Sequence, residues 1–149
     1  MVPPSLKGRA LRHLATREHS RRELEQKLKA HEETPGELAR VLDELQAKDF
    51  INEQRVLDSV VHRRAGKLGA MRIRQELQGK GLPPDAVQAA VAGLQATELA
   101  RAREVWQKKF GVVAQTPAER ARQLRFLATR GFGADVLRRV VAGDGDDLD

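Results

Sequence analysis

LQGKGLPPD at residues 77–85 has a counterpart of the same design, LATRGFGAD, fifty residues later at 127–135, and this repeat indicates the fold. In each, a leucine precedes a cation and a glycine, a large apolar residue comes next, and an aspartate follows three residues later. Glycine commonly ends a helix, and an acid is favoured in a helix's first turn. Both stretches are therefore predicted to join two helices by the same tight turn.

The first third of the chain repeats the same apolar pattern at a shift of 49 residues. The aligned residues are Leu24, Leu28, Leu38 and Leu42 with Ile73, Leu77, Val87 and Val91. We therefore predict an all-α fold, an elongated array of three tandem three-helix (helix-turn-helix-like) repeats. The repeats are placed at residues 1–49, 50–95 and 96–142, and the acidic tail at 143–149 is expected to be disordered.

Apolar residues recur at helical spacing throughout, and no run alternates with the period of a strand. Two matching buried faces are predicted at Leu38, Val41, Leu42 and Leu45 and at Val87, Ala90, Val91 and Leu94. In the last repeat, one face is predicted at Leu99, Ala102, Trp106 and Phe110, and another at Ala121, Leu124, Leu127 and Ala128.

Capping residues divide these patterns into about nine helices. Ser20 and Glu23 have the spacing of a capping box, and Asn52 could cap a helix that begins at Glu53. Thr34-Pro35 and Thr116-Pro117 are each predicted to place an N-cap before a proline in the first helical position.

Composition limits the chemistry that is available. The 149 residues are 40% apolar, enough for a folded core, and contain no cysteine, which excludes disulfides, thiolate zinc sites and a catalytic thiol. A reducing cytoplasm is the natural location. The N-terminus lacks the apolar segment of a secretion signal, and no run of residues is long and apolar enough to cross a membrane, so neither secretion nor membrane insertion is expected.

Positive charge grows along the chain. The net charge of +6 includes four acids within the last six residues, so the rest carries +10, divided as +1, +3 and +6 over the three repeats. A basic body of this kind suggests contact with a polyanion, because each phosphate that is neutralised releases counterions. The alternative is a solvated surface of mixed sign, as any highly charged helical protein has.

A search for catalytic signatures returns none. The chain has no nucleophile elbow, phosphate loop, dinucleotide fingerprint or zinc-protease motif, and its four histidines lack the spacing that puts two on one helix face. We therefore predict a protein that is not an enzyme and that has no metal site and no cofactor.

Arginine is the remaining signal, with 19 Arg against 8 Lys. Its guanidinium group suits bidentate contact with phosphate or carboxylate. The candidate contact residues are Arg17, Arg21, Arg22, Arg63, Arg64, Lys67, Arg72, Arg74, Lys80, Arg120, Arg122, Arg125, Arg130, Arg138 and Arg139. From the residues alone, these could enter a DNA groove in the helix-turn-helix manner or dock on an acidic protein surface.

Three segments together resemble one family. ALRHLATREHSRREL at residues 10–24, GAMRIRQEL at 69–77 with KGL at 80–82, and FLATRGF at 126–132 are similar, in order and in spacing, to the RecX regulators of the bacterial RecA recombinase. The resemblance covers residues 6–141. One departure is Asn52-Glu53 with Val56, where the family has paired acids followed by an aromatic residue.

The resemblance implies a non-enzymatic cytoplasmic protein that binds RecA and its filament on single-stranded DNA. Such a protein, expected to be a monomer, would mainly inhibit RecA by modulating strand exchange, ATP hydrolysis and coprotease activity. Two alternatives stay open: a stand-alone DNA-binding regulator built from helix-turn-helix-like modules, and a helical adaptor without nucleic acid.

Overall fold

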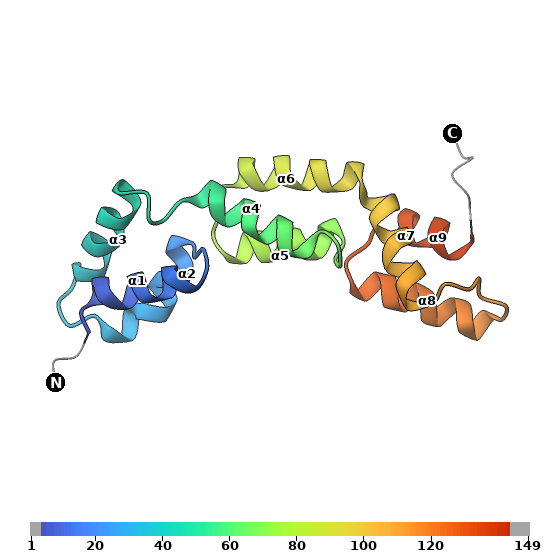
Figure 1. The fold of residues 1–149 in the computed structure, drawn as a ribbon, viewed down its shortest axis with the longest axis horizontal. Helices are drawn as coiled ribbons and strands as arrows, with labels where there is room; N and C mark the ends of the chain where they lie inside the picture. Colours follow the sequence, from blue (N-terminus) through green and yellow to red (C-terminus); the bar gives the residue numbers. More distant parts are fainter. Residues whose placement is uncertain (1–3, 144–149) are drawn as a thin grey trace.

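The computed structural model, which describes residues 4–143, is an elongated row of three helical modules (Figure 1). The first module holds α1–α3, the second α4–α6 and the third α7–α9, and no strand occurs within the described range. The predicted all-α array of three tandem three-helix repeats is confirmed. The prediction of a disordered acidic tail concerns residues that, from 144 onward, lie outside the described part of the chain.

The helices have the following bounds. They are α1 (Leu6–Thr16), α2 (Arg21–Leu28) with a 3-10 turn (Lys29–His31), α3 (Glu37–Ala47), α4 (Glu53–Arg64), α5 (Ala70–Gly79), α6 (Pro84–Ala96), α7 (Glu98–Lys109), α8 (Pro117–Thr129) and α9 (Ala134–Val141).

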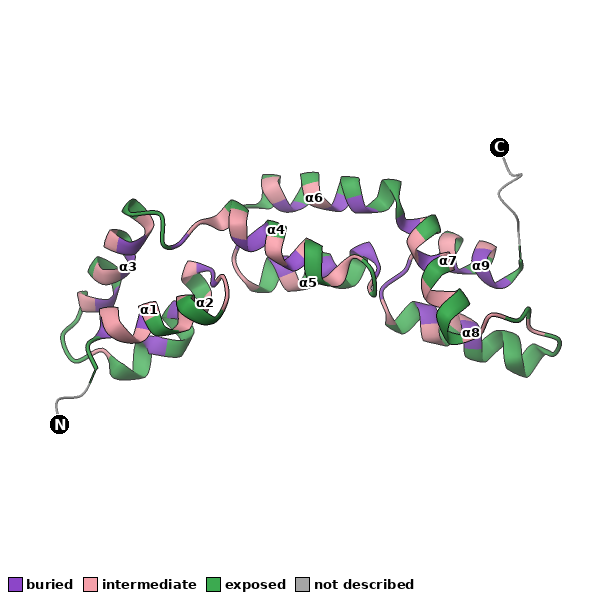
Figure 2. Ribbon diagram, viewed as in Figure 1, coloured by how far each residue is buried: buried purple, intermediate pink, exposed green. Residues whose placement is uncertain are grey.

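Each module has its own apolar core. Leu24, Leu28, Leu42 and Leu45 fill the first core, Ile73, Leu77, Val56 and Val60 the second, and Leu127, Ala102 and Phe132 the third. Buried residues accordingly lie along the inner faces of each three-helix group (Figure 2). Because the three clusters have no residue in common, the position of each module relative to the next must be held by contacts outside the cores.

The two repeated stretches adopt the same helix-ending turn. Gly81 and Gly131 have φ of +73° and +90°, the left-handed conformation that glycine adopts without a steric penalty. In each turn the glycine N–H and the following N–H donate to carbonyls of the last helical turn. Leu82 and Phe132, which follow the glycines, are 5% and 3% exposed, so the predicted apolar residue of the turn is buried in both.

Three of the four predicted N-caps are confirmed, and one is wrong. Ser20, Asn52 and Thr116 each accept a hydrogen bond from a first-turn amide. Thr34-Pro35 does not cap α3.

Instead, Thr34-Pro35-Gly36-Glu37 forms a tight turn, in which Thr34 O accepts from Glu37 N at 3.1 Å and Gly36 has a φ of +86°. Proline followed by a left-handed glycine is the preference of a type II turn. The helix therefore starts two residues later than predicted, and its Leu38 amide donates to the Glu32 carboxylate at 2.9 Å.

The predicted inner face of α8 is wrong in part. Leu127 is fully buried, but Ala121 and Ala128 are exposed, and Gln123 is buried instead. Gln123 accepts from the Trp106 indole at 2.9 Å and donates to Val112 O at 3.1 Å. A hydrophobic pattern misses a buried glutamine, because its burial depends on partners from other parts of the chain.

We expect Leu77→Ala and Leu127→Ala each to lower the free energy of unfolding by about 2–5 kcal/mol, because both leucines are fully buried and truncation leaves a cavity. Met71→Ala, on α5 but 58% exposed, is the matched control and should change it by less than about 0.5 kcal/mol. Chemical denaturation measures all three. Equal losses for Leu77→Ala and Met71→Ala would contradict the assigned core.

Candidate functional site

The predicted contact residues differ in how far their charge is already neutralised within the protein. Five of them form ion pairs with carboxylates: Arg17, Arg21, Arg64, Lys80 and Arg138. The other ten make no ion pair among the described residues 4–143: Arg22, Arg63, Lys67, Arg72, Arg74, Arg120, Arg122, Arg125, Arg130 and Arg139. The sequence groups these fifteen residues by type alone. The structure separates the five paired residues, which we call the structural set, from the ten without an ion pair, which we call the uncompensated set.

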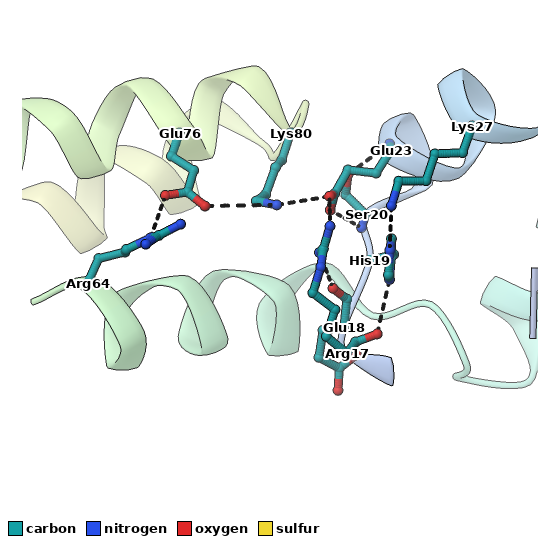
Figure 3. A network of polar contacts seen from close by, with 9 residues as sticks. All are labelled: Arg17, Glu18, His19, Ser20, Glu23, Lys27, Arg64, Glu76 and Lys80. Atoms are coloured by element: carbon teal, nitrogen blue, oxygen red, sulfur yellow. Dashed lines mark hydrogen bonds and ion pairs between the residues drawn. The ribbon is translucent and has the colours of Figure 1, made fainter. Parts of the chain in front are cut away.

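Three of the five paired residues, Arg17, Arg64 and Lys80, belong to a chain of alternating charges between the first and second modules (Figure 3). Lys80, the C-cap of α5, lies 2.9 Å from the Glu23 carboxylate of α2 and 4.0 Å from Glu76, which also accepts from Arg64 at 3.0 Å. The Lys80 and Glu23 side chains are only 12% and 13% exposed. The pair is therefore screened less by solvent than an ordinary surface ion pair.

Glu23 has two roles at this junction. Its Oε1 accepts from the Ser20 amide and completes the predicted capping box, while its Oε2 accepts from Arg17 at 2.7 Å and faces Lys80. Burial alone would raise the pKa of Glu23, but the hydrogen bonds from Arg17, the Ser20 amide and Lys80 outweigh it and lower the pKa to about 2.

A second ion pair crosses the same junction. Arg55 of α4 donates to the Glu18 carboxylate at 2.9 Å, and its guanidinium also reaches the side chain and the carbonyl of Asp49. Arg22 lies directly against Gly81, where an added Cβ would be 2.7 Å from Arg22 Nε. The first junction is therefore built from charged side chains around one glycine.

The loop that carries Glu18 is ordered by a buried histidine. His19 is 1% exposed, and its Nδ1 lies 3.0 Å from Arg17 O while its Nε2 lies 3.2 Å from Lys27 Nζ. A carbonyl can only accept and an ammonium can only donate, so the ring is neutral with its proton on Nδ1. Burial lowers the pKa of His19, and the nearby Arg17 and Lys27 charges act in the same direction.

The second and third modules are joined by backbone. Gly69 N donates to Arg130 O at 2.8 Å, and Met71 N donates to Gly131 O at 3.3 Å. A Cβ on Gly69 would lie 2.4 Å from the Gly131 carbonyl carbon, a distance that real side chains do not show. The two segments can approach this closely only because position 69 is glycine, and a Cβ on Gly131 would likewise collide with Arg72.

A buried carboxylate completes this second junction. Glu98 is 5% exposed and accepts from Ala70 N at the start of α5 and from Gly133 N at the start of α9, both at 2.8 Å. Arg101 lies 3.8 Å from Glu98 and donates to Ala65 O and Leu68 O at 2.8 Å. One acid therefore satisfies free amides of two helices in different modules.

Several residues that make these junctions were not predicted from the sequence. Glu98 and Arg101 carry no signal beyond helix-forming residues, and Arg55 and Glu18 pair over a sequence separation that no local pattern encodes. Gly69 did have a local signal, because it directly precedes the helical pattern of the segment at 69–77 and so marks a helix start. Only the close approach of Gly131 explains why it is glycine.

The uncompensated set gathers partly in two hollows. Arg72 and Arg130, together with Lys67 and Arg64, line a cleft of about 580 Å³ between the second and third modules. A groove of about 770 Å³ beside α5 and α6 is lined by Arg22 and Arg74 together with glutamines and prolines.

Other predicted contact residues stay apart from these hollows. Arg120, Arg122 and Arg125 are exposed on α8, and Arg139 is half-buried on α9. Arg122 lies over the Phe110 ring with its guanidinium carbon 6.0 Å from the ring centre. The structure therefore distributes the positive charge over several helices in place of one recognition helix.

No group of three or more His, Asp or Glu side chains in residues 4–143 is arranged to hold a metal ion. None of the described helices is long and apolar enough to cross a membrane.

Fold and surface together define an elongated helical protein of tandem three-helix modules with dispersed basic side chains. Comparison with known proteins agrees: the first, second and third three-helix domains of RecX match residues 7–45, 52–91 and 96–141. The chain belongs to the RecX family of regulatory proteins.

Relatives named regulatory protein RecX match most of the chain. The protein of Leptothrix cholodnii is 54% identical over 92% of this chain and 87% of its own, and that of Ralstonia nicotianae is 44% identical over 97% and 95%. Two crystal structures share the fold, one of a regulatory protein RecX (TM-score 0.73, 21% identity) and one of RecX from Lactobacillus salivarius (TM-score 0.71, 18% identity). The first alignment covers 91% of this chain and 70% of the other, and the second covers 93% of each.

We expect Gly69→Ala to lower the free energy of unfolding by about 1–3 kcal/mol, because the new methyl group meets the Gly131 backbone and cannot be accommodated without shifting it. Gly93→Ala is the control, since nothing lies within 4 Å of its added Cβ and it sits inside α6, where alanine should stabilise by about 0.5–1 kcal/mol. Thermal unfolding compares them. A neutral Gly69→Ala would contradict the close approach.

We expect the stability that Glu23 contributes to depend on pH. Its pKa of about 2 lies below the ordinary value of 4.5, so its contribution is complete above pH 4.5 and is lost as the pH falls towards 2. The difference corresponds to at most about 3 kcal/mol. Unfolding of wild type and Glu23→Gln, measured from pH 2 to pH 7, should converge at the acidic end.

The control for this experiment is Glu44→Gln. The pKa of Glu44 is also lowered to about 2, by Lys7 and Lys48, but these groups lie in solvent, which screens the pairs. Glu44→Gln should therefore follow wild type closely at every pH. A constant gap between wild type and Glu23→Gln across the range would show that the carboxylate charge of Glu23 does not matter.

Proposed function

We propose that this protein regulates the RecA recombinase, mainly as an inhibitor, by lying along the RecA filament on single-stranded DNA. In this role it modulates strand exchange, ATP hydrolysis and coprotease activity, acts as a monomer in the cytoplasm, and supplies no catalytic group. Membership of a family of regulatory proteins supports a role that works through binding.

One observation carries the proposal: the protein is an elongated array in which two specific junctions fix the orientation of each module relative to the next. An array of this kind can contact a helical filament at several successive places, whereas a globular domain of equal mass presents one compact face. The alternation of modules and junctions also leaves basic side chains available along its whole length.

The distribution of charge distinguishes this function from its main alternative. A stand-alone DNA-binding regulator would place its base-reading side chains on one helix that enters the major groove. Here the uncompensated cations lie on several helices, with Arg22 on α2, Arg74 on α5, Arg125 on α8 and Arg139 on α9. Dispersed contacts of this kind favour a long partner over a short DNA sequence.

The proposal is tested by RecA-catalysed strand exchange with the purified protein. We expect wild type to inhibit, and we expect Arg22→Gln, Arg74→Gln and the double variant Arg122→Gln/Arg125→Gln each to lose part of the inhibition, with losses that accumulate on combination. Because Arg22 packs against Gly81, thermal unfolding checks that Arg22→Gln keeps the first junction intact. The largest loss should come from the double variant, because the third module has the highest charge, +6. ATP hydrolysis by RecA is followed in parallel.

The matched control is Arg138→Gln, which removes an exposed arginine that already has an acidic partner, Asp135, one helical turn away. It should inhibit as wild type does. If wild type leaves RecA unaffected and selects one duplex sequence over random competitors, the stand-alone regulator takes the place of the proposed function. If wild type neither affects RecA nor binds DNA, the helical adaptor takes the place of the proposed function.

A further inference from the structure

The cleft between the second and third modules is lined mainly by cations. Its lining has four cations, Arg64 and Lys67 from the end of α4 and the loop after it, Arg72 from α5 and Arg130 from the end of α8, and only one acid, Glu76. Glu76 is already engaged by Arg64 at 3.0 Å. The cleft therefore keeps a net positive charge that no carboxylate in its lining neutralises.

Two of these cations are held in place without being neutralised. Arg72 donates to Thr129 O at 2.6 Å, and its Cβ and Cγ lie so close to Gly131 that any side chain there would collide with them. Arg130 lies over the Phe126 ring at 4.4 Å. A carbonyl and an aromatic face orient a guanidinium but leave its charge available to a ligand, which lowers the entropic cost of binding.

The remaining lining indicates the class of ligand. Besides the charged residues it contains Gln75 and Leu68, so its lining has one apolar side chain and no aromatic ring on which a base could stack. Protein partners are anchored mainly by buried apolar and aromatic side chains. Contacts to a nucleic-acid backbone are made by Arg, Lys and Gln, and they carry no sequence information.

We infer that this cleft binds the sugar–phosphate backbone of single-stranded DNA, independent of sequence, with Lys67 and Arg130 as direct phosphate contacts. The inference rests on the proposed function, because it gives the elongated array a defined point of contact with the strand that the filament encloses. It assigns that contact to the junction that Gly69, Gly131 and Glu98 hold rigid. The position of the phosphate is then fixed relative to both modules.

The test measures binding of a fluorescent oligothymidylate, without RecA, over a series of salt concentrations. Each phosphate contact on a single strand contributes about 0.7 to the slope of log affinity against log salt. Lys67→Gln/Arg130→Gln should therefore make the slope shallower by about 1.4 and weaken binding. Lys67→Arg, which keeps the charge, should restore the slope that Lys67→Gln loses.

The charge-matched control is Arg63→Gln. Arg63 is exposed on α4 next to Arg64 but does not line the cleft, so its removal should leave the slope close to that of wild type. Thermal unfolding of each variant verifies that the fold is kept. Arg72 is left intact, because its packing against Gly131 makes it part of the junction.

A wild-type slope in a folded Lys67→Gln/Arg130→Gln variant would overturn the inference. So would a variant that binds oligothymidylate normally but fails to bind poly-glutamate, since the cleft would then receive an acidic protein. Both results leave the proposed regulation of RecA standing. Conversely, failure of wild type to affect strand exchange removes the proposed function without changing the outcome of the oligonucleotide experiment, which contains no RecA.

Discussion

Glu98 is a buried carboxylate between the starts of two helices that belong to different modules, and the arrangement of the second and third modules depends on it. It accepts from Ala70 N and Gly133 N, and beside it the Gly69 and Gly131 backbones approach more closely than any side chain would allow. The separate cores of the modules do not fix their relative orientation. This small polar contact fixes their relative orientation. Separating the modules would leave the buried amides and the Glu98 carboxylate without hydrogen-bond partners, which costs free energy.

The two junctions achieve the same result by different physics. Between the first and second modules, side-chain charge dominates: Glu23 with Lys80 and Glu18 with Arg55 cross the gap, and Arg22 covers Gly81. Between the second and third modules, backbone hydrogen bonds and one buried acid dominate. The first junction is therefore sensitive to pH through Glu23, whereas the second depends on the small volume of two glycines together with one buried carboxylate.

This division explains why so basic a sequence is not uniformly a binding surface. Arg17, Arg64 and Lys80 use their charge within the protein, to join or brace modules. Lys67, Arg72 and Arg130 keep theirs, because their orientation comes from a loop, a carbonyl and an aromatic ring. A count of arginines cannot make that distinction, since it follows from which carboxylate lies within reach in the folded chain.

The sequence by itself determined the modules. The glycine turns at Gly81 and Gly131, the caps at Ser20 and Asn52, and the leucines of the cores are local signals, because a helix and its ends are decided by residues a few positions apart. Local reasoning failed at Thr34-Pro35, where Gly36 converts a helix start into a turn, and at Gln123, whose burial depends on Trp106. Only the tertiary structure decided how the modules are joined and which cations remain available. Those contacts, such as Arg55 with Glu18 and Glu98 with Gly133, join residues more than thirty positions apart, and geometry alone brings them together.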